Sequence, residues 1–490
     1  MEYDKDLQSI QEARLVIEAA KKAQQKLAAM SQEQIDAIVK KMAEQVSEKA
    51  VDLAKMANEE TGFGNVRDKT LKNKFASEVV WSSIKDMQTV GILKDDKDKQ
   101  VMDVAVPMGV IAGLIPSTNP TSTTIYKALI AIKSGNAIVI SPHPGAKKAI
   151  LETVKILRQA ASEAGAPCGI IGSLTILTAK GTEELMKHQD TAMILATGGE
   201  AMVRAAYSSG NPAIGVGPGN GPAFIERTAN TEQAVADIIA SKTFDNGVIC
   251  ASEQSIVVER TISQQVIAEL KKNKAYFLSE DESRILAGFI LRGNGTMNPK
   301  IVGKTANTIA EMAGIPVPSE TTVLVSAQKT VSKENPYCKE KLCPILAFYI
   351  EENWLDACNR SIELLNVEGR GHTLCIHSQD PEVIKEFALH KPVSRMLINT
   401  PGALGGIGGT TNLAPALTLG CGAVGGSSTS DNITPLHLLN VRKAAYGVKS
   451  MESLRGPSEK VENINVSADI SDNEVRQLIE AALKKLTEIS

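Results

Sequence analysis

Apolar residues recur every three or four positions near the start of the chain, a spacing that predicts helices with one buried face. The spacing holds over residues 13–27 and again over 35–56. Ser31, with Glu33 and Gln34 shortly after it, is typical of a capped helix start. We therefore expect one helix over 32–58 after this cap.

Short apolar runs then alternate with helical patterns from Met108 to Glu226. This alternation is typical of βαβ units and of a mostly parallel, doubly wound sheet. Ligands of such sheets bind at the carboxyl ends of the strands. The expected strands are 109–115, 137–140, 171–177 and 193–196, and the expected helices are 121–133, 146–163 and 200–208.

A second α/β block follows over about 235–426. It ends in the glycine-rich segment 401–426, where interleaved apolar and Thr residues indicate a loop that fits closely around something. The patterns therefore predict the α/β fold class, with a doubly wound sheet in the first block. The expected strands of this block are 255–259, 322–326 and 374–377, and its expected helices are 262–272 and 354–365.

The character of the chain changes again after Tyr446. Residues 455–470 are polar and interrupted, which predicts a linker. An amphipathic helix is expected beyond it, and it either docks on its own subunit or binds a partner. Its apolar face consists of Val475, Leu478, Ile479, Ala482, Leu483 and Leu486.

The composition excludes several functional classes. With 490 residues the chain is long enough for two or three domains. Its 53 basic and 56 acidic side chains give a net charge of −3, and aromatic residues make up 3%, so we expect no nucleic-acid partner. No apolar run has bilayer-spanning length and the N-terminus lacks a signal-peptide pattern, so we expect no membrane contact and a cytoplasmic location.

Seven cysteines are scattered without a C-x-x-C pair, which disfavours a disulfide scaffold or a metal site. Cys250 has a distinct context. Asp245-Asn246-Gly247 predicts a tight turn before it, and the small residues beside it leave a thiol reachable. Cys250 is therefore a candidate nucleophile, with a buried bystander as the alternative.

Eight sequence blocks in one order resemble the aldehyde dehydrogenase superfamily, and specifically its coenzyme-A-acylating branch. The resemblance implies an aldehyde-dehydrogenase-like fold with two doubly wound α/β domains and a bridging oligomerisation sheet, in a homodimer or larger oligomer. The blocks are PSTNP, SPHP, LATGG, AYSSGNPAIGVGPGN, FDNGVICASEQS, CKEKLCP, GRGHTLCIHS and TLGCGAVGG.

The resemblance also implies a division into domains. By this resemblance, N-terminal helices and an NAD(P)-binding domain are expected over 1–235 and a catalytic domain over 236–430. A return and bridging segment is expected over 431–454, and a linker with a tail helix over 455–490. Segments 99–107 and 435–448 would form the bridging sheet. The tail resembles peptides that direct enzymes into bacterial microcompartments, so a shell protein or another partner of 470–490 is one expectation.

Three residues match the catalytic positions of the superfamily. Cys250 matches the nucleophile that forms a thiohemiacetal with the aldehyde and, after hydride transfer to a nicotinamide, a thioester. Asn119 matches the side chain that holds the oxyanion together with the Cys250 backbone N–H. His372 matches a histidine of the acylating branch that assists the incoming thiol or the hydride step, and a packed histidine is the alternative.

The strand–helix turns contain no G-x-G-x-x-G motif, which alone argues against a dinucleotide fingerprint. The superfamily binds NAD(P) through differently built turns. Glu340 matches the acid that accepts from the nicotinamide ribose, and His143 replaces a lysine of hydrolytic members, which leaves NAD or NADP open. The implied cofactor residues are Pro116, Ser117, Thr118, Asn119, Ser141, His143, Thr197, Gly198, Gly199, Gly217 and Glu340.

One difference between this sequence and the hydrolytic members of the superfamily indicates the reaction type. Hydrolytic members carry a Glu general base in the segment that matches 217–220, but this chain has no acid between Tyr207 and Glu226. We therefore expect coenzyme A, rather than water, to accept the acyl group. A hydrolytic dehydrogenase and a silent scaffold are the alternatives.

The resemblance places the substrate end at 422–430, a segment without a cation. Gly425, Ser427, Ser428 and Thr429 are its candidate pocket residues. We expect a short, acetaldehyde-like substrate oxidised reversibly with NAD and CoA to acyl-CoA and NADH. The alternative is a small anionic aldehyde: succinate semialdehyde, bound for example by Arg395, or sulfoacetaldehyde, bound by the hydroxyls.

Overall fold

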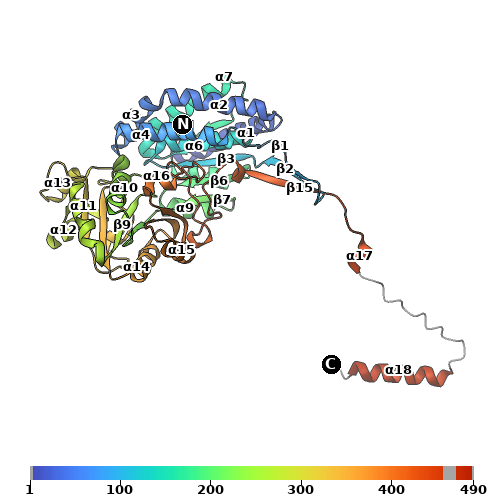
Figure 1. Cartoon of the computed structure of the whole chain (residues 1–490). Coiled ribbons are helices and arrows are strands. Elements are labelled where there is room, and N and C mark those ends of the chain that lie inside the picture. The colour runs from blue at the N-terminus through green and yellow to red at the C-terminus, as the bar shows by residue number, and fades with distance from the viewer. Residues whose placement is uncertain (1–3, 456–470, 488–490) are drawn as a thin grey trace. The chain divides into compact units, whose positions relative to one another are not determined.

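The computed structural model describes residues 4–455 and 471–487. They belong to two units (Figure 1). The larger unit comprises Met1–Lys94 with Asp103–Arg442, and the smaller comprises Asp95–Met102 with Lys443–Ser490. All candidate site residues lie in the larger unit.

A five-stranded parallel sheet forms the first half of the larger unit. Its strand order is β5-β4-β3-β6-β7, so the chain starts in the middle of the sheet and winds outward in both directions. The strands are β3 (Val110–Ile115), β4 (Ala137–Pro142), β5 (Ile171–Ser173), β6 (Thr191–Thr197) and β7 (Ala213–Val216), and the helices between them are α6 (Pro120–Lys133), α7 (Lys147–Glu163), α8 (Ala179–Lys187) and α9 (Glu200–Tyr207). Every strand and helix expected here is present, but β5 ends at Ser173, four residues before the expected end at 177, and the other ends shift by one or two residues.

The N-terminal helices cover this sheet. Ser31 caps α2 through a capping box with Gln34, as expected. The expectation of one helix over 32–58 is wrong, because Lys49 leaves helical geometry and separates two helices. Both pack against α7, so the apolar spacing continues across the break and gives no sign of it. The elements are α1 (Lys5–Leu27), α2 (Gln32–Glu48), α3 (Ala50–Thr61), α4 (Val66–Lys74), the π-helical turn η1 (Phe75–Val79) and α5 (Val80–Ile84).

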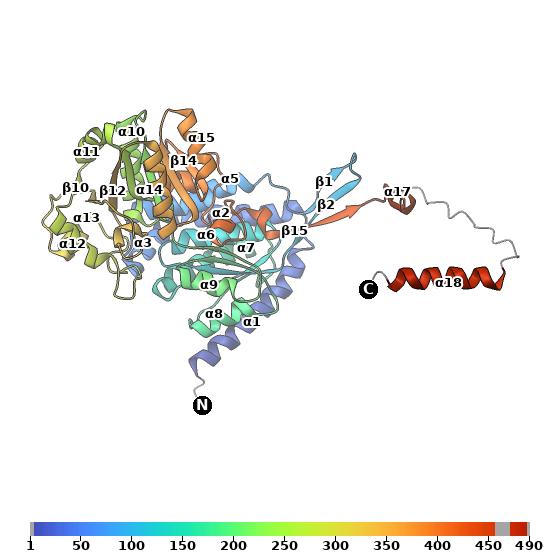
Figure 2. The ribbon, with the colours of Figure 1, turned by 90° about the horizontal axis from the view of Figure 1, so that it is seen from below.

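A seven-stranded parallel sheet forms the second half, in the order β10-β11-β12-β9-β8-β13-β14. Helices surround it (Figures 1 and 2). The strands are β8 (Gly221–Ile225), β9 (Glu253–Glu259), β10 (Ala275–Phe277), β11 (Val323–Ala327), β12 (Ile345–Glu351), β13 (Gly371–His377) and β14 (Val393–Ile398). The helices are α10 (Thr231–Thr243), α11 (Ser263–Lys272), α12 (Glu280–Ile290), α13 (Ala306–Ala313), α14 (Trp354–Val367), α15 (Pro381–His390) and α16 (Gly402–Gly406).

The central strands of this sheet are apolar on both faces, as buried parallel strands are. In β9, Val257 packs into one hydrophobic cluster, and Ile256 and Val258 pack into the cluster on the other face. The α/β fold class with two parallel sheets is confirmed.

The chain passes from the first sheet to the second within residues 217–220, between β7 and β8. The domain boundary expected at residue 235 falls later, inside α10. Because β7 ends and β8 begins at this crossing, the carboxyl end of one sheet meets the amino end of the other there. The division into domains stays a prediction.

A third sheet has the strand order β1-β2-β15, with β1 (Gly91–Asp96), β2 (Val101–Pro107) and β15 (Leu439–Ala445). The two segments expected in a bridging sheet thus supply two of its strands. Its role between subunits stays a prediction.

The smaller unit contains α17 (Met451–Arg455) and the expected tail helix, α18 (Asp472–Thr487). The linker expected over 455–470 lies outside the described residues except for Arg455. Within the described ranges, every helix is too short or too polar to cross a membrane.

Candidate active site

The candidate residues come from two facing sheet ends. Loops at the carboxyl ends of β3, β4, β6 and β7 carry the residues expected to bind the cofactor. Segments at the amino ends of β9, β12 and β13 carry Cys250, Glu340 and His372. Parallel strands align their loops at one edge, so residues far apart in sequence are brought to one place.

Gly219 lies where three of these residues meet. A Cβ added to Gly219 would lie 2.0 Å from the carbonyl oxygen of Cys250 and 3.3 Å from Cε1 of His372. The Gly219 N–H donates to Oε1 of Glu340 over 2.8 Å. The structure therefore brings Cys250, His372 and Glu340 together around one backbone position.

Cys250 lies in the turn between the 3₁₀ turn η3 (Phe244–Gly247) and β9, and it is half-buried. Burial raises the pKa of its thiol to about 12, and the nearby Glu340 and Cys421 add to that increase. Arg395 acts in the opposite direction. The thiol is thus protonated at neutral pH in the free protein, and its sulfur is less open than the small neighbouring residues suggested.

Arg395 is buried on β14 and uses its donors within the protein. Nε donates to Oδ1 of Asn432 over 2.7 Å, and Nη2 donates to the carbonyls of Ser430, over 2.9 Å, and Gly420. Nη1 donates to the carbonyl of His372 over 3.3 Å. Arg395 therefore ties the 420–430 loop to the amino end of β13 and places a cation near Cys250.

His372 is 1% exposed at the start of β13. Its Nδ1 and Oγ1 of Thr373 are 2.9 Å apart, and its Nε2 has no hydrogen-bond partner within the described ranges. Burial, assisted by the charge of Arg395, lowers the pKa of His372 to about 3. The imidazole is therefore neutral, and its buried Nε2 has no partner among the described residues.

Glu340 is an acid that titrates near neutral pH. Burial raises the pKa of its carboxyl to about 8, and Glu368 adds to the increase, while the Gly219 N–H opposes it. Sequence analysis assigned Glu340 only to the ribose. Its charge also acts on Cys250, and the sole sign of this in the sequence is an acid between two lysines.

Asn119 occupies the N-cap position of α6 but makes no capping hydrogen bond. Its Oδ1 instead accepts from Nζ of Lys72 over 2.6 Å. Lys72 also donates to the carbonyl of Val248 over 2.9 Å, two residues before Cys250. Sequence analysis missed Lys72, because nothing local to α4 shows which loops it contacts.

The cofactor loops fit a dinucleotide at several positions. Thr197 Oγ1 is buried without a partner in the described part of the chain. Gly199 begins α9 without a side-chain cap, and a Cβ on Gly199 or Gly217 would meet nothing within 4 Å. Free helix N–H groups and an open backbone suit phosphate oxygens. Pro116, Ser117, Thr118 and Gly198 lie in the loops at the same sheet end.

Two residues predicted to bind the cofactor, Ser141 and His143, form hydrogen bonds within the protein instead. The hydroxyl of Ser141 is 2.9 Å from Oγ1 of Thr182. His143 is exposed, and its Nδ1 accepts the Gly145 N–H over 3.0 Å, so the ring packs on its own turn. Among the described residues, no hydrogen bond or ion pair links His143 to Cys250, His372 or Glu340.

The hydroxyls of the predicted substrate loop are bound by the protein. Ser427 Oγ donates to the carbonyl of Gly215 over 3.3 Å and accepts from the hydroxyl of Tyr207 over 3.1 Å. Ser428 Oγ donates to the carbonyl of Ala213 over 3.0 Å. These hydroxyls therefore attach the loop to β7.

A cavity of about 620 Å³ opens beside this loop. Gly425 packs closely on the start of β13, where a Cβ on Gly371 would lie 2.7 Å from the Gly425 Cα. The cavity is lined by Val393, Ser394, Cys421, Gly422, Ala423, Val424, Ser428, Thr429 and Ser430.

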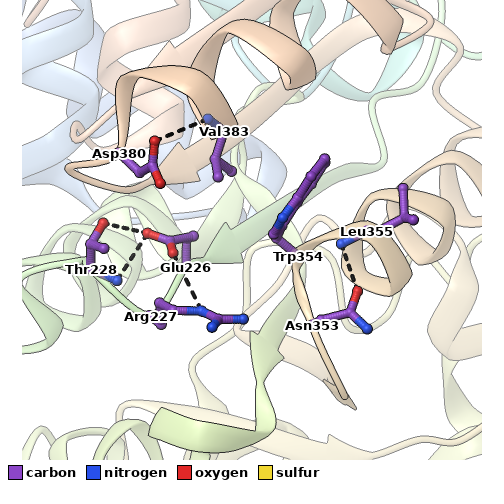
Figure 3. Close-up of a pocket in the computed structure, with 8 residues that line it drawn as sticks. All are labelled: Glu226, Arg227, Thr228, Asn353, Trp354, Leu355, Asp380 and Val383. Atoms are coloured by element: carbon purple, nitrogen blue, oxygen red, sulfur yellow. Dashed lines mark hydrogen bonds and ion pairs between the residues drawn. The ribbon is translucent and has the colours of Figure 1, made fainter.

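A second cavity, of about 490 Å³, lies at the opposite, carboxyl end of the seven-stranded sheet (Figure 3). Its polar groups are occupied: Glu226 accepts the Thr228 N–H over 2.9 Å, and Asn353 and Asp380 cap α14 and α15. None of the candidate residues lines it.

Comparison with known proteins agrees with this geometry. The sequence model of the aldehyde dehydrogenase family matches residues 6–282. The bifunctional aldehyde-alcohol dehydrogenase of Escherichia coli K12 is 44% identical over 448 residues, covering 90% of this chain and 50% of that protein. The succinate-semialdehyde dehydrogenase (acetylating) of Clostridium kluyveri is 39% identical, covering 88% of this chain and 95% of that protein. The chain spans about half the length of the bifunctional relatives it matches.

Several solved structures are similar to this chain over about nine-tenths of its length. A structure described as a probable aldehyde dehydrogenase from Listeria monocytogenes has a TM-score of 0.92 and 63% identity, over 92% of this chain and 100% of that chain. An acetylating aldehyde dehydrogenase from Geobacillus thermoglucosidasius has a TM-score of 0.90 and 53% identity over the same shares. A propionaldehyde dehydrogenase from a Clostridium phytofermentans fucose-utilisation microcompartment has a TM-score of 0.81 and 29% identity, over 89% and 97%.

Proposed function

Because this chain belongs to the aldehyde dehydrogenase family, we propose that it oxidises a short-chain aldehyde with NAD and coenzyme A to acyl-CoA and NADH, reversibly. The observation that carries the proposal is the packing of Gly219 against Cys250. Residue 219 has no room for a side chain, and residues 217–220 include no acid, so this segment offers no base to activate water against a thioester.

The first step is attack of the Cys250 sulfur on the aldehyde carbon. An S–C bond forms, the carbonyl π pair moves to the oxygen, and the thiol proton passes to a solvent water molecule. The Cys250 N–H and Nδ2 of Asn119 hold the oxyanion, a charge that develops only as the bond forms. Arg395 favours the thiolate, because its charge lowers the pKa of Cys250 against the effect of burial.

The adduct then becomes a thioester on Cys250. When bound, NAD(P) supplies the acceptor for the hydride that leaves the adduct. Thr197, Gly199 and Gly217 would hold its phosphates, and Glu340 its nicotinamide ribose. With Glu340 protonated at neutral pH, a ribose hydroxyl could donate to it or accept from it. NAD is proposed as the cofactor, with NADP as the alternative.

The thioester is finally transferred to coenzyme A. The CoA sulfur attacks the carbonyl carbon, and the Cys250 sulfur leaves. The departing Cys250 sulfur takes up the proton of the incoming thiol, and the neutral His372, whose buried Nε2 has no hydrogen-bond partner in the described part of the chain, is proposed to orient that thiol by accepting a hydrogen bond from it.

The binding groups support a small uncharged aldehyde. The hydroxyls of Ser427 and Ser428 are bound to backbone carbonyls, and Arg395 donates to protein acceptors. A sulfonate or carboxylate in this site would displace those bonds. We therefore place acetaldehyde and propionaldehyde ahead of succinate semialdehyde and sulfoacetaldehyde.

The function is tested by following NADH formation with each of these four aldehydes, with and without CoA. Cys250→Ala should abolish CoA-dependent NADH formation. Cys168→Ala, at an exposed cysteine, is the matched control and should keep it. Equal rates with and without CoA would overturn the acylating reaction, and activity retained by Cys250→Ala would overturn the nucleophile.

The assembly is a separate part of the proposal. We propose the domain division 1–235, 236–430, 431–454 and 455–490, and a homodimer or larger oligomer joined through the third sheet. Sedimentation of the purified protein tests the oligomer, and a monomer would reject it.

A microcompartment shell protein or another partner is proposed for the tail. The apolar residues Val475, Leu478, Ile479 and Leu486 of α18 are exposed, and one similar structure comes from a microcompartment enzyme. A reporter fused to 470–490 should co-purify with shell protein. A reporter that remains unassociated would overturn the idea and leave a cytoplasmic enzyme.

A further inference from the structure

Two buried lysines on α4 meet one buried carboxylate. Lys69 and Lys72 lie one helical turn apart, and each is 3% exposed. Their Nζ atoms lie 3.0 and 2.6 Å from Oδ2 of Asp245, which is fully buried in the η3 turn. The Asn65 N–H, at the start of α4, donates to the other Asp245 oxygen over 2.7 Å. The helix start and the turn are thus held together by charge-assisted bonds.

The two lysines differ in what else they contact. Lys72 uses its other two N–H donors on Oδ1 of Asn119, over 2.6 Å, and on the carbonyl of Val248, over 2.9 Å. Lys69 donates instead to the backbone carbonyl of Thr118, over 3.2 Å. Only Lys72 therefore touches the side chain of the residue matched to the oxyanion donor.

This contact determines how the Asn119 amide is turned. An amide has one acceptor end and one donor end, whereas an ammonium group only donates. With Oδ1 facing Lys72, Nδ2 faces away from it. Asn119 does not cap α6, and its Nδ2 has no protein partner in the described part of the chain. The donor end is thus left for a ligand.

We propose that Lys72 is the positioning residue of the oxyanion site: it holds the Asn119 amide with Nδ2 toward the substrate oxygen, and through Val248 it ties that amide to the Cys250 turn. This inference rests on the proposed function, because it concerns the same thiohemiacetal oxygen. A buried lysine that only neutralised Asp245 would not need Asn119, since Lys69 already pairs with that carboxylate.

The test compares Lys72→Met with Lys69→Met. Each change removes one buried ammonium group and leaves Asp245 with the other lysine as its partner. Rates are divided by the concentration of folded protein, measured by circular dichroism and thermal unfolding, so misfolded protein does not count. For Lys72→Met we expect kcat/KM for the aldehyde to fall about 10- to 100-fold, somewhat less than for loss of an oxyanion donor. The KM values for NAD and CoA should stay within twofold, and Lys69→Met should lose less than fivefold.

A double-mutant cycle separates positioning from general structural support. In an Asn119→Ala background there is no amide to orient, so Lys72→Met should then cost less than threefold. Equal losses in both backgrounds, or an equal loss for Lys69→Met, would overturn the inference.

A CoA-free measurement keeps this inference separate from the proposed function. Formation of the thiohemiacetal protects Cys250 from iodoacetamide, and Lys72→Met should raise the aldehyde concentration for half-protection at least tenfold. Unchanged protection overturns the role of Lys72. A wild-type protein that is protected by aldehyde but makes no CoA-dependent NADH overturns the proposed reaction alone.

Discussion

The backbone of Gly219 lies directly against the peptide of Cys250, so that a Cβ on Gly219 would be 2.0 Å from the Cys250 oxygen and 2.9 Å from its carbonyl carbon. Both atoms are backbone, so a rotamer change cannot relieve the contact. The same glycine donates its N–H to Glu340. One residue without a side chain thus contacts both the Cys250 peptide and the Glu340 carboxyl group.

Gly219→Ala should therefore inactivate the protein without unfolding it. The added methyl group displaces the Cys250 turn, and we expect kcat to fall at least about 100-fold, since small misplacements of reacting groups have such effects. Gly288→Ala is the control: a Cβ there, within α12, meets nothing within 4 Å, and the change should keep activity and raise stability by about 0.5–1 kcal/mol. Steady-state rates and thermal unfolding of both variants check this, and an active Gly219→Ala would contradict it.

The reactivity of Cys250 should depend on pH through Glu340. The pKa of Glu340 is about 8 and that of Cys250 about 12, so the acid ionises first as the pH rises. Its negative charge then raises the pKa of the thiol. An isolated thiol with this pKa would be alkylated roughly tenfold faster per pH unit between pH 7 and 9. Iodoacetamide alkylation of Cys250 in the wild type, followed by mass spectrometry of the peptide that contains it, should rise less than that.

In Glu340→Gln, the rate of Cys250 alkylation should rise by the full, roughly tenfold factor per pH unit. The variant should match wild type at pH 7, where Glu340 is protonated, and react several-fold faster at pH 9, where the wild-type carboxylate is charged. Both rates are measured by alkylating the free protein with iodoacetamide and quenching samples at set times. Identical pH profiles would show that the charge of Glu340 does not reach Cys250.

Replacing Arg395 should affect both reactivity and stability. Arg395→Met removes the cation that lowers the pKa of Cys250, so alkylation at pH 8 should slow. It also leaves the acceptors at Ser430 and Asn432 unpaired, which should lower the free energy of unfolding by about 2 kcal/mol or more. Arg395→Lys should not rescue stability, because one ammonium group cannot reproduce the guanidinium fork.

Arg284→Met is the matched control for this change, since Arg284 is an exposed arginine on α12. Urea unfolding and alkylation should both stay at wild-type values for this control. Wild-type values for Arg395→Met would refute the bridging role of Arg395.

The stability of the fold should fall as the pH drops below about 6.5. Burial lowers the pKa of His377 to about 4, so the unfolded chain takes up a proton at a pH where the folded chain does not. The stabilising contribution is complete above the unfolded pKa of about 6.5 and is lost as the pH falls toward 4. His377→Gln should lose about 2 kcal/mol less than wild type between pH 7 and pH 5. Urea titrations at both pH values, with His390→Gln as an exposed control, test this.

Much of the fold was predictable from local patterns. The strands β3, β4, β6 and β9 are apolar runs between turn residues, and Ser31 with Gln34 marks the start of α2. The break at Lys49 was not predictable, because the two helices on either side bury the same face against a common partner.

Of the candidate site, only the residues within recognisable sequence motifs were predictable. The resemblance to a known family pointed to Cys250, Asn119 and His372 through short blocks of sequence. Lys72 and Asp245 are 173 residues apart, and no local pattern records that they form an ion pair. The Asp245-Asn246-Gly247 turn was predicted, and Asp245 and Asn246 do take left-handed geometry, but the burial of Asp245 depends on α4. The raised pKa of Glu340 likewise depends on Glu368 and on depth, which sequence does not give.

The crossing of the chain between the two sheets has a consequence for genetic recombination. Residues 217–220 look like the natural junction at which to exchange one half of this protein for that of a relative. Yet that junction holds Gly219, whose backbone must match the Cys250 turn of the other half. A chimera cut there would combine residues 217–220 of one parent with the Cys250 turn of the other. Viable crossover points should therefore lie outside 217–250, so that Gly219 and the Cys250 turn come from the same parent.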